Sequence, residues 1–149
     1  MKLKKYIICD SARAESGKTA VLSELADKLK SSKNIKQLDF KDLNNGDVWY
    51  LFECKGKKIC IITGGDDAKS IKKWLDWSMK ANADIVVCAS RSKGDTVHCV
   101  NEFASKSGFS IVKFSNYFCE GDDSEINALN ECTAESILNV IEKLLNIKF

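Results

Sequence analysis

Residues 12–19 have the types and the spacing of a loop that holds a phosphate group. Gly17 lets backbone N–H groups approach an anion closely, because glycine carries no Cβ atom. Lys18 adds a positive charge, and the hydroxyl group of Thr19 is suited to bind Mg²⁺. The chemistry that this segment predicts is the binding of a phosphate-bearing ligand together with a divalent cation.

The elements on either side of this segment are those that a phosphate-binding loop needs. The apolar residues 6–9 predict a strand before it. Apolar side chains at helical spacing predict a helix after it: Val21, Leu22, Leu25, Ala26 and Leu29. A helix that begins at the loop directs its partial positive charge toward a bound anion. The order strand, loop and helix therefore agrees with the chemistry of the loop.

At residues 12–19 the chain resembles the P-loop NTPase superfamily, in the relaxed form of its Walker A motif. The matching residues are Ala12, Gly17, Lys18 and Thr19, with Ala12 where the common motif has its first glycine. The resemblance implies binding of a nucleoside triphosphate, ATP before GTP, with Mg²⁺. It implies these cofactor-binding residues: Ala12, Arg13, Ala14, Glu15, Ser16, Gly17, Lys18 and Thr19. It covers roughly the first 30 residues specifically and assigns no subfamily.

The resemblance also implies an acidic residue near the end of a neighbouring strand. The residue directly after the apolar run 59–62 is Thr63, so we expect Asp66, slightly later, to position water or metal. An alternative for Asp66 is that it only caps the helix that follows. Asp10 and Asp39, expected at the ends of the first two strands, are further acidic residues at the same edge.

Arg13 and Arg91 are the two arginines in a chain whose other 21 basic residues are lysines, and both fall in loops that follow predicted strands. Arginine suits bidentate contact with phosphate and stabilises charge in phosphoryl transfer. With Lys18 at the β- and γ-phosphates, the expected catalytic residues are Lys18, Asp66 and Arg91, and the expected metal ligands are Thr19 and Asp66. The alternative for the arginines is an ordinary solvated surface position.

Apolar runs alternate with helical patterns, which predicts one three-layer α/β domain over residues 1–149. We expect five to six strands in a mostly parallel sheet, with one antiparallel hairpin arm. The hairpin is predicted over residues 48–63, with Gly56 in its turn. A later helix is expected to begin with Asp95 or Thr96 as its N-cap and to end at Gly108.

Composition restricts the class of protein. A formal charge of +2, with no basic cluster interleaved with aromatic residues, does not indicate a nucleic-acid partner. No stretch approaches the roughly 20 apolar residues of a membrane span, so we expect a cytoplasmic protein. The seven cysteines form no C-x-x-C pair, and with the single His98 they give no zinc-ligand spacing. We expect buried, reduced thiols at Cys9, Cys60 and Cys88, and a structural or solvent-facing His98.

Two functions remain open from the sequence. The first is Mg²⁺-dependent binding of a nucleoside triphosphate with hydrolysis or phosphoryl transfer, as an NTPase or a small-molecule kinase whose acceptor is unknown. The second is a non-catalytic nucleotide-sensing or adaptor protein with a degenerate loop. Glu15 and the missing acid at Thr63 favour the second, in which the aromatic face with Trp74 and Trp77 would meet a protein partner.

Overall fold

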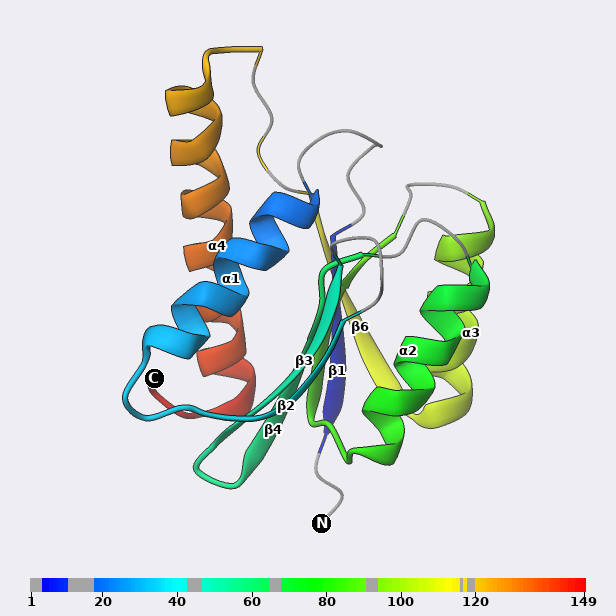
Figure 1. The fold of residues 1–149 in the computed structure, drawn as a ribbon. Helices are drawn as coiled ribbons and strands as arrows, with labels where there is room; N and C mark the ends of the chain where they lie inside the picture. The colour runs from blue at the N-terminus through cyan, green and yellow to red at the C-terminus, as the bar shows by residue number, and fades with distance from the viewer. Residues whose placement is uncertain are drawn as a thin grey trace.

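The computed structural model describes residues 4–10, 18–42, 47–64, 68–90, 94–115, 117 and 120–149, and for Lys18 it describes only the backbone. These residues form a six-stranded sheet with helices on both faces (Figure 1). The strands are β1 (Lys5–Asp10), β2 (Lys36–Asp42), β3 (Val48–Cys54), β4 (Lys57–Ile62), β5 (Ile85–Ala89) and β6 (Phe109–Phe114). The helices are α1 (Lys18–Ser31), α2 (Ala68–Lys80), α3 (Asp95–Ser107) and α4 (Asp123–Leu145).

The strand order is β2-β3-β4-β5-β1-β6. β1 pairs in parallel with both β5 and β6, and β4 pairs in parallel with β5. β3 is antiparallel to both of its neighbours, β2 and β4. The predicted α/β class with a mostly parallel sheet is thus confirmed, and β3 is the antiparallel arm of the predicted hairpin.

The helices divide into two pairs, one on each face of the sheet (Figure 1). α1 and α4 pack together over one face, where side chains such as Ile8 and Val87 point. α2 and α3 pack together over the other face, where Ile7 and Val86 point. Every residue of β5 is buried, as expected for a strand covered on both faces. The predicted apolar stripe of α1 is confirmed, since all five of its side chains are fully buried.

The turns follow from a few residues with positive φ. Lys55 and Gly56 link β3 and β4 with φ angles of 51° and 80°, the backbone that a two-residue hairpin turn requires. The expected N-cap of α3 is wrong: Gly94, with φ of 97°, occupies that position, and Asp95 is the first helical residue. Asp95 and Thr96 therefore lie in the first turn, where a carboxylate is favourable next to the helix N-terminus.

The last helix is fixed at its start by a reciprocal pair of hydrogen bonds. The Asp122 carboxylate accepts from the backbone N–H of Glu125 at 2.9 Å, and the Glu125 carboxylate accepts from the N–H of Asp122 at 3.4 Å. Such a capping box satisfies two N–H groups that lack partners within the helix. In the described part of the chain, no helix combines the length and the apolar character needed to cross a membrane.

Candidate functional site

The chain leaves the neighbouring strands β1 and β5 toward opposite faces of the sheet. After β1 it leads to α1, on the face shared with α4, and after β5 it leads to α3, on the face shared with α2 (Figure 1). Open α/β sheets bind ligands beyond the carboxyl ends of two parallel strands whose connections diverge in this way. We call this position, beyond the ends of β1 and β5, the divergence point and take it as the candidate site.

Two buried polar residues lie at the divergence point. Asp10 ends β1 and is fully buried, and Ser90, directly after β5, is 3% exposed. The backbone N–H of Ser90 donates to the carbonyl of Asp10 at 3.0 Å, and the Cys9 thiol donates to the Ser90 hydroxyl at 3.3 Å. Burying a carboxyl or hydroxyl group is costly without compensating interactions. The ends of β1 and β5 are therefore tied together by polar contacts at the candidate site.

The fold brings both ends of the predicted phosphate-binding loop to this point. β1 ends at Asp10, and α1 begins at Lys18, so the predicted strand and helix around the loop are confirmed. Thr19 lies in the first turn of α1 and is exposed. The loop residues themselves lie outside the described part of the chain: Ala12, Arg13, Ala14, Glu15, Ser16 and Gly17.

Asp66 and Arg91 also lie outside the described residues, so their predicted roles stay predictions. Their neighbours in the chain are described. In the sequence, Arg91 directly follows Ser90, which is buried at the divergence point. Asp66 follows Gly64 by two residues, in the segment that leads from β4 to α2. In the sequence, the two residues come shortly after β5 and β4.

Thr63, where an acid is missing after β4, has a structural role. It is 2% exposed, and its hydroxyl accepts a hydrogen bond from the backbone N–H of Val48 at 2.8 Å. Its own N–H donates to the carbonyl of Val48 at 3.0 Å. Thr63 thereby extends the pairing of β3 and β4 by one residue, and its hydroxyl oxygen is used as an acceptor within that pairing.

The same edge holds an acidic residue that the sequence reasoning missed. Asp47, half-buried, directly precedes Val48 at the start of β3. A Cβ atom built on Gly64 would overlap Oδ2 and Cγ of Asp47 and would lie 2.8 Å from its Cβ atom. The carboxylate of Asp47 therefore occupies the space that a side chain at position 64 would take. The available signal was an acid directly before an apolar strand that pairs with residues 57–62.

Asp39 does not join the site, contrary to the expectation that it ends the second strand at the ligand edge. It lies within β2, is exposed, and accepts a hydrogen bond from the backbone N–H of Phe40 at 2.8 Å. Four strand spacings of about 4.8 Å separate β2 from β1, so the two strands lie roughly 19 Å apart. That distance is too long for direct contact with a phosphate bound at β1.

The thiols and the histidine behave as predicted. Cys9, Cys60 and Cys88 are buried, and burial raises the pKa of Cys60 to about 12. His98 is solvent-facing, with Nε2 4.0 Å from a Glu102 oxygen. Within the described ranges, no three His, Cys, Asp or Glu side chains form a group able to hold a metal ion.

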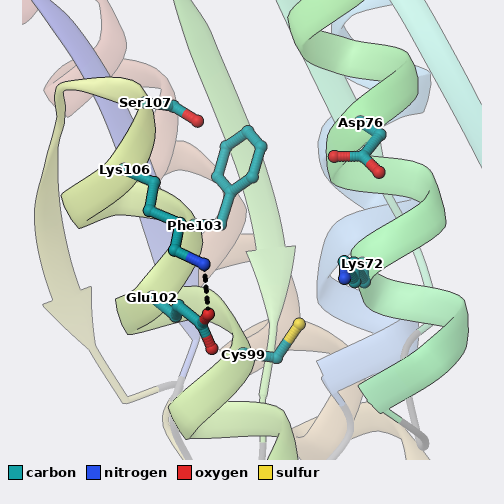
Figure 2. Close-up of a pocket in the computed structure, with 7 residues that line it drawn as sticks. All are labelled: Lys72, Asp76, Cys99, Glu102, Phe103, Lys106 and Ser107. Atoms are coloured by element: carbon teal, nitrogen blue, oxygen red, sulfur yellow. Dashed lines mark hydrogen bonds and ion pairs between the residues drawn. The ribbon is translucent and has the colours of Figure 1, made fainter.

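A hollow of about 160 Å³ lies between α2 and α3 (Figure 2). Lys72 and Asp76 border it from α2, and Phe103 borders it from α3. Beside them, Lys106 and Glu102 form an ion pair of 2.6 Å. None of the predicted site residues lines this hollow, so it does not extend the candidate site.

Comparison with protein-family models, curated proteins and solved structures finds no match for this chain. The fold and the residues at the divergence point are therefore the grounds on which a function is assigned.

Proposed function

We propose that the protein binds a nucleoside triphosphate, ATP before other nucleotides, at the divergence point with Mg²⁺, and hydrolyses it or transfers its terminal phosphoryl group. The observation that carries this proposal is the position of Gly17-Lys18-Thr19 in the chain, at the junction between β1 and α1. The segment connects β1, a largely buried strand with a neighbour on each side, to the start of a helix at the divergence point. A phosphate-binding loop needs that position.

The roles of the residues follow from their chemistry. Backbone amides of residues 12–19 and the N-terminus of α1 would surround the phosphates, and Lys18 would neutralise the β- and γ-phosphates. Thr19 would offer its hydroxyl to Mg²⁺, Asp66 would position water or metal, and Arg91 would contact a phosphate or the acceptor. Mg²⁺, when bound, would supply positive charge at the phosphates; it commonly takes only one or two protein oxygens, so a prebuilt cluster of ligands is not needed.

A non-catalytic nucleotide sensor or adaptor is the second candidate, favoured by the structural role of Thr63. For its partner surface, the two tryptophans differ. Trp74 is 9% exposed and belongs to the core. Trp77 is half-buried, and the ammonium groups of Lys41 and Lys73 each lie 5.1 Å from its ring centroid. Under this proposal, Trp77 rather than Trp74 would meet a protein partner.

Thermal unfolding with and without nucleotide tests the binding. ATP with Mg²⁺ at a hundred times its Kd should stabilise the parent protein by about 2.7 kcal/mol. Lys18→Ala removes a charge-assisted contact worth about 1.5–3 kcal/mol, so its Kd should rise roughly 10- to 150-fold. Lys33→Ala, an exposed lysine beyond the end of α1, is the matched control and should bind like the parent.

Different outcomes separate the two candidates. If no nucleoside triphosphate shifts the unfolding of the parent, or if Lys18→Ala binds as tightly as the parent, the proposed binding site is wrong. If nucleotide binds but no phosphate is released or transferred, the sensor replaces the enzyme. Phosphate release in the presence of Mg²⁺, lost in Lys18→Ala and kept in Lys33→Ala, supports the enzyme.

A further inference from the structure

We propose that Asp47 is a residue of the nucleotide site and supplies, from the start of β3, the carboxylate that is missing directly after β4. The inference rests on the proposed nucleotide function. It assigns to Asp47 a position beside the Mg²⁺-bound phosphates, where its negative charge favours the metal-bound form of the nucleotide over the free form.

The topology of the sheet places Asp47 at the correct edge. β3 is antiparallel to β4, so the start of β3 lies at the carboxyl end of β4. The two hydrogen bonds between Val48 and Thr63 fix this register directly beside Asp47. Only β5 separates β4 from β1, so the ends of β4 and β1 lie two strand spacings, or about 10 Å, apart. Asp47 itself precedes β3, one strand further from β1, but its carboxylate lies toward β4, in the space beside Gly64. Mg²⁺ usually keeps several bound waters, so a carboxylate can act on it through one of them.

Gly64 is the residue whose missing side chain leaves room for the Asp47 carboxylate. The φ angle of Gly64 lies outside the positive range that favours glycine, so the conformation of the chain does not require glycine there. The carboxylate does require it, because any larger residue would overlap Asp47. Glycine at position 64 thus keeps free the space that the Asp47 carboxylate occupies, at the beginning of the segment that contains Asp66.

Electrostatics gives the proposal a distinctive signature. A carboxylate near a phosphate repels it, and a divalent cation between the two reverses the sign of the interaction. Removing the charge of Asp47 should therefore weaken binding of the Mg²⁺–nucleotide complex but leave binding of free nucleotide equal or tighter. A side chain that only shapes the loop would change both affinities in the same direction.

The experiment measures Kd for ATP in excess Mg²⁺ and in excess EDTA, by titration calorimetry, for the parent and Asp47→Asn. We expect Kd of the variant to rise at least threefold in Mg²⁺ and to stay equal or fall in EDTA. Asp84→Asn is the matched control, because Asp84 is an aspartate with a structural role at the opposite end of the sheet, where its carboxylate accepts from the N–H of Lys58 at 2.9 Å. Its ratio of the two affinities should equal that of the parent.

Each further outcome counts against the proposal. Affinities unchanged in both conditions, or weakened equally in both, would remove Asp47 from the site while leaving the nucleotide function intact. A parent protein that binds no nucleotide in either condition would overturn the proposed function and this inference together. If Asp47→Asn does not fold, Asp47→Ser, with a shorter hydrogen-bonding side chain, takes its place, and melting without nucleotide confirms its folding.

Discussion

The two ends of the parallel strands differ in what their polar groups do. At the amino end, Asp84 joins three strands: its carboxylate accepts from the N–H of Lys58, its N–H donates to the carbonyl of Lys58 at 2.8 Å, and its carbonyl accepts from Tyr6 at 3.0 Å. At the carboxyl end, Asp10, Thr63 and Ser90 are buried polar residues that follow or end three neighbouring strands.

The difference favours the carboxyl end of the strands as the place of the proposed ligand site. The described contacts at the amino end connect strands to one another and to the two-residue turn at Gly56. The four helices of the described residues all begin on the side of the carboxyl end, and their first N–H groups need acceptors from outside the helix (Figure 1). Changes at the amino end should therefore affect stability alone, while changes at the carboxyl end should affect ligand binding as well.

Gly64→Ala should have the largest effect on stability among the variants that test this comparison. The added Cβ atom would overlap the Asp47 carboxylate, and overpacking of this kind costs typically 1–3 kcal/mol of unfolding free energy. Urea unfolding of Gly64→Ala, Asp47→Ala and the double variant measures the overlap. Since Asp47→Ala removes the two nearest obstructing atoms, Oδ2 and Cγ, and leaves only Cβ, the double variant should be more stable than the sum of the single effects predicts. Additive effects would show that the two residues do not compete for one space.

Asp84→Ala should have an intermediate effect. It leaves the partly buried N–H of Lys58 without its acceptor, which costs about 1–2 kcal/mol within the range for an unsatisfied buried donor. Chemical denaturation measures the loss, and nucleotide titration in Mg²⁺ should give the Kd of the parent. A changed Kd would remove the functional contrast between the two ends of the sheet.

Glu102→Gln should have the smallest effect, because the Glu102–Lys106 pair lies on the surface of α3. The hydrogen bond from Lys106 lowers the pKa of Glu102 below its ordinary 4.5. Any stabilisation from this carboxylate is therefore present above pH 4.5 and is lost as the pH falls through the lowered pKa. At pH 7 the Tm should change by about 1 °C or less, and Tm measured against pH checks the sign. A larger change would show that this pair contributes more than a solvated surface pair does.

Local patterns were enough to predict most of the fold. The helix α1 could be predicted from its apolar stripe, and the strand β5 from its continuous apolar run. This worked because positions that are buried on one or both faces of an element carry apolar side chains. The predicted start of α3 was wrong by at least one residue. Gly94 is the N-cap, with a positive φ and no side-chain hydrogen bond to the helix. The general preference for a polar N-cap residue does not predict a glycine at this position.

The candidate site was predicted only in part, for a reason of distance along the chain. The strand and helix around the loop could be recognised because they are adjacent in sequence. The relation of Asp47 to Gly64 depends on the pairing of two antiparallel strands, which no local pattern contains. Asp39 was misplaced for the same reason, since its distance from β1 depends on the order of strands in the sheet.

The position of β1 has a consequence for how the protein folds. β1 comes first in the chain, yet both of its partners, β5 and β6, come late. Contacts between such distant segments form slowly, because a long loop must close before they stabilise the chain. During synthesis the hairpin of β3 and β4 can form locally, while β1 must wait for β5 to leave the ribosome. The proposed nucleotide site would therefore be absent from the growing chain and would be completed only after β1 has paired with β5 and β6.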